Sequence, residues 1–269
     1  MPSSLARLLR LLGACLLATG AAHSAETDRP PEVLGIAAAS NLVHVLNPLH
    51  RAFERANPGV AFRTSVAASG SLFAQIRQGA PFDVFLSADT DYPAQLVAAG
   101  LAPASSVQRF ARGRLALWTG RNDLAGTDLG EALRRGTFQT IALAQPRTAP
   151  YGRAAEEVLA RLGFAANDRS RLVVSENIAQ AAQWVGTGTA EAGFVAVSLL
   201  LATAPEPRGQ WQEIPADWHP RTSLDHAVVL TTRGATRAAA RRYVDFLLSP
   251  VAQEILHAAG YAPASIPPR

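Results

Sequence analysis

The sequence predicts an α/β protein with two series of alternating strands and helices. Short apolar segments rich in β-branched and aromatic residues alternate with longer segments whose apolar residues recur at helical spacing. This alternation is typical of mainly parallel sheets flanked by helices. It runs over residues 33–99 and starts again at residue 114, which predicts two lobes in one chain.

The first series contains three expected strands and three expected helices. The strands are placed at residues 33–39, 60–67 and 83–88, and the helices at residues 41–57, 71–78 and 91–99. Pro48 lies inside the first helix, so a kink or a short separate first turn is expected there. Pro58-Gly59 and Gly100 supply stop signals after the first and third helices.

The second series repeats the pattern and is followed by a return to the first lobe. Strands are expected at residues 114–119, 140–144, 172–175 and 193–197, and helices at residues 127–135, 152–162 and 178–185. A last strand at 226–232 precedes two C-terminal helices, of which the second begins at Ser249-Pro250. The chain should therefore cross between lobes twice, near residues 108–114 and 221–226. The expected lobes are residues 26–110 with 223–269, and residues 111–222.

The first 25 residues are interpreted as a cleaved signal peptide. Arg7 and Arg10 precede an apolar run at 11–22 that is too short to span a bilayer. An uncleaved anchor and a lipoprotein site at Cys15 are the weaker alternatives. Cys15 is the only cysteine, so the mature chain should contain neither disulfides nor thiolate metal sites.

The charge pattern does not indicate a nucleic-acid partner. Every one of the 25 basic residues is an arginine, and without Arg7 and Arg10 the remaining 23 face 21 acids. The arginines are scattered, and short pairs such as Arg134-Arg135 fit solvated helix faces better than a phosphate track.

Four predicted helices open at junctions rich in small or hydroxyl residues, each of which ends an apolar run. The junctions are residues 37–41, 67–71, 149–152 and 175–178. Taken singly, each is an ordinary helix cap. The first N–H groups of a helix lack intrahelical partners and carry a partial positive charge, so they favour anions. Ligands of open α/β sheets bind at the carboxyl ends of strands. Together the junctions predict a small oxyanion held between the lobes by neutral donors.

Other motifs give no support to an enzyme, a cofactor or a metal site. The glycines at residues 186–188 do not fit the dinucleotide fingerprint, and no nucleophile elbow or Ser-His-Asp set is present. Asp83, Asp89 and Asp91 suggest a hard metal only weakly, because Asp89 and Asp91 fit turn and cap positions. We therefore expect no catalytic residue and no cofactor. An enzyme on a related two-lobed scaffold remains an alternative.

Several segments resemble those of the periplasmic molybdate-binding proteins of bacterial molybdate ABC transporters. They lie at residues 37–40, 79–89, 193–196, 249–253 and 260–261. The resemblance implies a two-lobed type II periplasmic-binding-protein fold with the anion in the interlobe cleft. It also implies a periplasmic monomer that binds molybdate or tungstate and delivers it to an inner-membrane ABC permease.

The same resemblance implies which residues hold the anion. Ser40 and Ser69 would supply hydroxyl and backbone donors from the first lobe. Tyr151 and Ile178 would supply backbone N–H groups from the second lobe.

One position departs from the family pattern. Many members place a ligand-binding tyrosine in the strand where this chain has Ala196, and Asn41 is the candidate replacement for that donor. The same fold binding sulfate, phosphate or another oxyanion remains open, because cavity size is not visible in a sequence. A transcription-factor effector domain is less favoured, since an export signal occupies the N-terminus.

Overall fold

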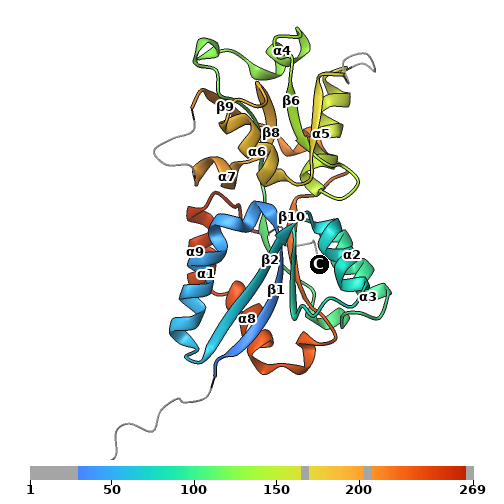
Figure 1. The fold of residues 1–269 in the computed structure, drawn as a ribbon, viewed down its shortest axis with the longest axis vertical. Coiled ribbons are helices and arrows are strands. Elements are labelled where there is room, and N and C mark those ends of the chain that lie inside the picture. Colours follow the sequence, from blue (N-terminus) through green and yellow to red (C-terminus); the bar gives the residue numbers. More distant parts are fainter. Residues whose placement is uncertain (1–29, 165–169, 203–207, 265–269) are drawn as a thin grey trace, which may run out of the picture. The chain divides into compact units, whose positions relative to one another are not determined.

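The computed structural model describes residues 30–164, 170–202 and 208–264. The predicted signal peptide at residues 1–25, with Cys15, lies outside the described residues. Within them the chain forms two five-stranded mixed sheets, each with its own helices (Figure 1). No helix in this described part is long and apolar enough to cross a membrane.

The first sheet has the strand order β2-β1-β3-β10-β4. Strands β2, β1 and β3 are parallel, and β10 runs antiparallel to both of its neighbours. The strands are β1 (Glu32–Ala39), β2 (Val60–Ala67), β3 (Val84–Ser87), β4 (Gln108–Arg112) and β10 (Asp225–Leu230). The helical elements of this lobe are η1 (Ser40–Leu42), α1 (Val43–Ala56), α2 (Ser69–Arg77), α3 (Asp91–Ala98), η2 (Ala104–Ser106), η6 (Gly234–Thr236), α8 (Ala238–Leu247) and α9 (Pro250–Ala258).

The second sheet repeats this plan with the order β7-β6-β8-β5-β9. Strands β7, β6 and β8 are parallel, and β5 runs antiparallel to both of its neighbours. The strands are β5 (Leu115–Thr119), β6 (Ile141–Ala144), β7 (Leu172–Ser175), β8 (Ala192–Ala196) and β9 (Gln210–Glu213). The helical elements are η3 (Asn122–Leu124), α4 (Leu129–Arg134), α5 (Pro150–Arg161), α6 (Ile178–Gly186), α7 (Val197–Leu201) and η5 (Ala216–Trp218).

Strand β1 shows why the first sheet is covered on both faces. Its alternate side chains Leu34, Ile36 and Ala38 pack in one cluster with residues of α1 and α8. Ala37 packs in a second cluster with residues of α2 and α3. All four side chains are fully buried, as expected for a strand in a sheet with helices on both sides.

Besides short 3₁₀ turns, the prediction missed two described strands and one described α-helix: it placed no strand at β4 or β9 and no helix at α7. Both strands are polar edge strands, and none of the four residues of β9 is buried. An edge strand needs no continuous apolar run, so the usual strand signal is missing. Helix α7 continues directly from β8 with apolar residues, and periodicity cannot separate a five-residue helix from a strand.

The separate first turn expected at Pro48 is not found there, because α1 (Val43–Ala56) includes Pro48 in its interior. Residues Ser40–Leu42 form the 3₁₀ turn η1, and α1 then continues through Pro48. A proline inside a helix removes one backbone donor.

Two crossing segments join the sheets and lie side by side. The first passes through Gly113, between β4 and β5, and the second leads into β10. The Gly113 N–H donates to the Leu224 carbonyl at 2.8 Å. A Cβ on Gly113 would overlap the Tyr151 phenol oxygen and lie 2.7 Å from His226 Cε1, so glycine permits this packing. The lobe limits stated above remain a prediction, with β4 belonging to the first sheet through Arg112.

His50 of α1 is a buried histidine within an aromatic cluster. Its ring stacks on Phe62 with centroids 3.9 Å apart and lies 5.7 Å from the Tyr243 ring. Burial lowers the pKa of His50 from 6.5 to about 4. The imidazole is therefore neutral in the folded protein near neutral pH.

We predict that His50→Phe makes the folded state less sensitive to acid. Between about pH 6.5 and 4 the unfolded chain binds a proton at His50 that the folded chain does not. Stability is therefore full above pH 6.5 and falls as the pH decreases, at about 1.4 kcal/mol per unit of pKa difference. Urea unfolding at pH 7 and pH 5 should show a smaller loss for His50→Phe than for wild type. The exposed His44→Phe serves as the control, and an unchanged loss in His50→Phe would contradict the prediction.

Candidate functional site

The four strand–helix junctions lie next to one another in pairs. Strands β1 and β2 are parallel neighbours with Ala39 opposite Ala67, so η1 and α2 begin side by side. Strands β6 and β7 are parallel neighbours with Ala144 opposite Ser175, so α5 and α6 also begin side by side. Each sheet therefore offers two adjacent helix starts at the carboxyl ends of its strands.

The two pairs also meet each other. The Gly70 N–H at the start of α2 donates to the Thr148 carbonyl, in the turn before α5, at 2.8 Å. A Cβ on Gly70 would lie 2.9 Å from Thr148 Cα and overlap the Tyr92 hydroxyl, so this approach requires glycine. Turn η1 contacts α6 and α7. The structure thus brings together the segments of four residues predicted to bind the anion, and each is at most 3% exposed: Ser40, Ser69, Tyr151 and Ile178.

Ser69 has a hydroxyl proton to offer. Its Oγ accepts the Ala88 N–H at 3.0 Å, which leaves the O–H free to donate in another direction. Ser69 is also the first residue of α2, and its backbone N–H is one of the groups that a helix cannot satisfy internally.

Helix α5 presents the Tyr151 N–H as its first free donor. Pro150 occupies the first helical position and has no N–H. The next two N–H groups, of Gly152 and Arg153, both donate to the Ala149 carbonyl at 2.9 and 3.1 Å. Gly152 packs so closely on β6 that a Cβ there would overlap the Ala144 carbonyl.

Helix α6 presents the Ile178 N–H in the same way. Asn177 caps the helix, and its Oδ1 accepts the Ala179 and Gln180 N–H groups at 3.1 and 3.2 Å. The cap leaves the first N–H, that of Ile178, without an intrahelical partner. Nothing in the sequence-based prediction assigned this role to Asn177, although Asn before an apolar helical run is a recognised start signal.

Asn41 lies in a buried network with His226 and Tyr261. His226 Nδ1 is 2.9 Å from the Leu224 carbonyl, which can only accept, so Nδ1 carries the proton. Burial lowers the pKa of His226 to about 4, so the ring is neutral and Nε2 is an acceptor. The Asn41 amide N–H groups therefore donate to His226 Nε2 at 2.7 Å and to the Tyr261 hydroxyl at 2.9 Å.

This network bears on the expectation that Asn41 replaces the missing tyrosine donor at Ala196. Both amide protons of Asn41 are used within the protein, so its side chain offers no donor to an anion in this arrangement. The Tyr261 hydroxyl and the Ser198 hydroxyl both donate to the backbone carbonyl oxygen of Asn41, at 2.8 and 3.1 Å. The donor that Asn41 can still present is its backbone N–H, in the first turn of η1.

Two buried polar atoms near this network have no hydrogen-bond partner among the described residues. They are Asn41 Oδ1 and the Tyr151 phenol oxygen. Burial raises the pKa of Tyr151 well above 10, which keeps the phenol protonated. Buried polar groups without a partner are rare in native proteins. His50 Nε2 and the Tyr243 hydroxyl, in the aromatic cluster of the first lobe, are two further examples among the described residues.

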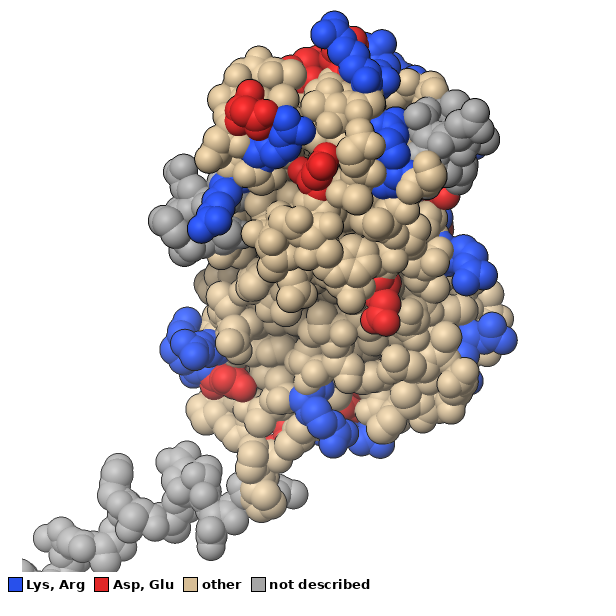
Figure 2. Space-filling model, turned by 45° about the horizontal axis from the view of Figure 1, so that its top comes forward, with Lys and Arg blue, Asp and Glu red and all other residues tan. Residues whose placement is uncertain are grey.

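The described residues show no constellation for metal binding, since no group of three His, Cys, Asp or Glu side chains lies close together. Acidic and basic side chains are scattered over the face shown in Figure 2, without a large area of one sign. Cavities of about 590, 480 and 350 Å³ are not lined by the junction serines, by Tyr151 or by Ile178; the smallest reaches Asn41. The junctions thus offer neutral hydrogen-bond donors on buried residues, and none of these three cavities is lined by Ser40, Ser69, Tyr151 or Ile178.

Two sheets of the same topology, joined by two crossings and with helix starts from both meeting at one place, are typical of a two-lobed solute-binding protein. The chain belongs to the family of bacterial extracellular solute-binding proteins, whose sequence model matches residues 34–262. The fold class expected from the sequence is confirmed.

The sequences and structures most similar to this chain over much of its length are consistent with this family assignment. The chain is 38% identical over 261 residues to the molybdate-binding protein ModA of Azotobacter vinelandii, covering 97% of this chain and 99% of the relative. It is 41% identical over 193 residues to ModA of Rhodobacter capsulatus, covering 72% and 74%. The solved structure of the Azotobacter vinelandii periplasmic molybdate-binding protein superposes with a TM-score of 0.80 at 31% identity, covering 86% of this chain and 100% of that one.

Proposed function

We propose that this chain is a periplasmic protein that captures molybdate and delivers it to the permease of an ABC transporter. The observation that carries the proposal is the meeting of four helix starts from two sheets, each with free neutral donors. The similarity to ModA proteins over nearly the whole chain supports molybdate as the anion.

In this proposal the anion is held by hydrogen bonds alone. The donors are the hydroxyl and backbone groups of Ser40 and Ser69 and the backbone N–H groups of Asn41, Tyr151 and Ile178. A hydrogen bond to a charged group contributes about 1.5–3 kcal/mol, so five to seven donors suffice for tight binding. Neutral donors also avoid a buried ion pair between protein and ligand. No bond is made or broken, and the protein acts as a monomer.

The arrangement couples binding to the approach of the lobes. Because each lobe supplies two helix starts, only the state in which they meet offers every donor to one ion. The anion therefore stabilises that state by its differential affinity. This is the form that would be presented to the permease.

Selectivity is proposed to come from the spacing of the donors. Molybdate and tungstate are nearly equal in size and larger than sulfate, so donors spaced for the first two would contact sulfate poorly. Tungstate is accordingly a second expected ligand. Binding of sulfate or phosphate instead would assign the same fold to another oxyanion.

A thermal-shift titration of the mature protein tests the function directly. Molybdate at a hundred times its dissociation constant should stabilise the folded state by about 2.7 kcal/mol. We expect molybdate and tungstate to raise the melting temperature, and sulfate and phosphate at equal concentration to have little effect. A larger rise with sulfate or phosphate would reject the molybdate assignment.

We predict that Ser40→Ala combined with Ser69→Ala weakens molybdate binding at least tenfold without unfolding the protein. The double variant removes two hydroxyl donors and leaves the backbone donors in place. Isothermal titration calorimetry measures the affinity. Ser249→Ala is the control, because this serine caps α9 through the Ala252 N–H and is not part of the junctions. Wild-type affinity in the double variant would remove both serines from the site.

We predict that Ile178→Pro lowers molybdate affinity by about tenfold or more. Proline is tolerated at the first helical position but has no N–H, so the change deletes one proposed donor and keeps α6. Asn177 is extended, as a residue before proline must be. Ile178→Ala is the matched control, because it loses the same buried packing and retains the N–H. Equal affinities of the two variants would show that this N–H does not bind the anion.

A further inference from the structure

Asn41 carries a buried acceptor that no described group satisfies. It is the middle residue of η1, directly after Ser40, and is 2% exposed. Its amide nitrogen donates to His226 and Tyr261, whereas its Oδ1 atom meets no donor among the residues that the structure describes. The proposed contacts at the junctions are all donors, so Oδ1 has the polarity that an anion repels.

The His226 ring fixes this orientation of the amide. The Leu224 carbonyl holds the Nδ1 proton at 2.9 Å, so an uncharged ring offers only a lone pair at Nε2. The donor that reaches this lone pair is Asn41 Nδ2, at 2.7 Å. The nitrogen and oxygen of an amide exchange places by a half turn, and the partners around them decide between the two orientations. The orientation of the Asn41 amide therefore depends on the charge of His226.

A proton at His226 Nε2 would favour the reversed amide. Nε2 would then donate to Asn41 Oδ1, and the N–H₂ group would take the place that Oδ1 occupies now. The backbone carbonyl of Asn41 would keep the Ser198 hydroxyl as its donor, which leaves the Tyr261 hydroxyl free to turn to the amide oxygen. Each of these acceptors then has a donor, and the amide N–H₂ group is available to an anion.

The charged groups beside His226 in the sheet are paired with one another. Asp225 precedes it on β10, and its carboxylate lies 2.8 Å from Arg112 Nε and 3.9 Å from Arg109 Nη1, both of β4. Phe110 of the same strand turns its ring edge to the imidazole, with centroids 5.9 Å apart. Asp225 is thus engaged by these arginines, and the side of the imidazole that Phe110 covers is apolar.

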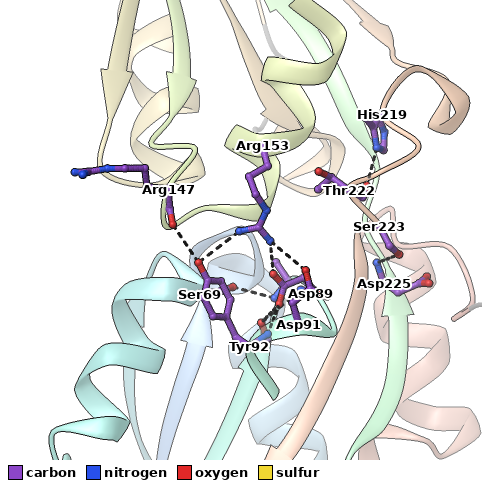
Figure 3. Close-up of polar contacts among 12 residues, drawn as sticks. Ser69, Asp89, Asp91, Tyr92, Arg147, Arg153, His219, Thr222, Ser223 and Asp225 are labelled. Carbon is purple, nitrogen blue, oxygen red and sulfur yellow. Dashed lines mark hydrogen bonds and ion pairs between the residues drawn. The ribbon is translucent and has the colours of Figure 1, made fainter. Parts of the chain in front are cut away.

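The groups that face the imidazole from other elements are uncharged or paired. The ring centroids of Tyr151 in α5 and of Tyr261, which follows α9, lie 6.3 and 5.4 Å from that of His226. Burial raises the pKa of both phenols, so they stay protonated. Arg153 of α5 reaches down to Asp89, 2.5 Å away, as Figure 3 shows. A dianion at the junctions would favour the charged form of His226, as a nearby opposite charge does.

We propose that His226 is a positioning residue of the oxyanion site: it takes up a proton from solvent together with the anion and thereby turns the N–H₂ group of Asn41 toward it. This inference rests on the proposed function and deepens it, because the site gains a donor only when the ligand arrives.

The coupling makes molybdate affinity depend on pH. Burial lowers the pKa of His226 to about 4, so the ring of the free protein is neutral above that pH. The anion raises this pKa. Between the two values binding takes up a proton, so the affinity increases as the pH falls through this window.

Isothermal titration calorimetry in two buffers of different ionisation enthalpy measures the proton uptake. At about pH 5.5 dilute molybdate is an ionised dianion, so the proton is taken up by the protein. We expect about one proton per bound molybdate at this pH, and an affinity about tenfold weaker at pH 7.5. His226→Gln has no side chain that titrates at position 226, so its uptake should vanish and its affinity should be nearly independent of pH.

His50→Phe is the matched control. His50 is a second buried histidine whose pKa burial lowers to about 4, but it belongs to the aromatic cluster with Phe62 and Tyr243. This variant should show the wild-type proton uptake and pH dependence. Ionisation of the ligand itself would contribute equally to the control and to His226→Gln, so the difference between them reports His226.

Asn41→Ala separates the amide from the field of the anion. Without Asn41 Oδ1 a protonated His226 has lost its acceptor, so we expect less than half of the wild-type proton uptake. Adding His226→Gln to this variant should weaken binding less than twofold further, because His226 acts through Asn41.

The charge of the ring can also be read without any variant. The nitrogen-15 chemical shifts of histidine side chains distinguish a cationic from a neutral imidazole, and at about pH 5.5 we expect His226 to be cationic with molybdate and neutral without it. A neutral ring in the complex, unchanged uptake in His226→Gln or full uptake in Asn41→Ala would each overturn the inference. Wild-type protein that binds no oxyanion would reject the proposed function itself, whereas molybdate binding without proton uptake rejects only the role of His226.

Discussion

The candidate anion site of this protein depends on backbone N–H groups that have no hydrogen-bond acceptor at the beginning of a helix. The first N–H groups of a helix point out of its end and need a partner from elsewhere. In this chain the local partners are few: Pro150 and the Asn177 cap reduce the free groups to single, well-defined N–H donors at Tyr151 and Ile178. Parallel pairing of β1 with β2 and of β6 with β7 then places such ends side by side. A small anion with several oxygen atoms is the complement of that geometry.

The junctions are neutral because the ionisable groups near them are either paired with another side chain or held uncharged. Arg153 is close in sequence to Tyr151 but is engaged by Asp89, and His226 beneath Asn41 is held neutral by burial. Charged groups thus support the walls of the site while the groups facing inward are amides and hydroxyls. This division suits a carrier, because an anion bound by a fixed arginine would be slow to leave for the next protein in the pathway.

The fold was largely predictable because its signals are local. Strands β1 and β6 are apolar runs, and β2 is rich in β-branched residues although it contains Arg63 and Ser65. The helices after the parallel strands carry regular stripes and stop signals, so β1, β2, β6, β7 and their helices were placed nearly correctly. The polar edge strands β4 and β9 and the short helix α7 were missed, since their residues are explained only by neighbours distant in sequence. The orientation of the Asn41 amide was equally inaccessible, because it depends on the His226 tautomer and on Tyr261, 185 and 220 residues away.

Gly113 has a mechanical consequence for the whole molecule. It is the point where the chain leaves the first sheet. The Tyr151 phenol and the His226 ring occupy the space that a side chain at this position would need. The phenol comes from α5 and the imidazole from β10, so side chains of both lobes pack against bare backbone at this crossing. Even a methyl group at position 113 would collide with both rings, so an alanine there would have to displace them.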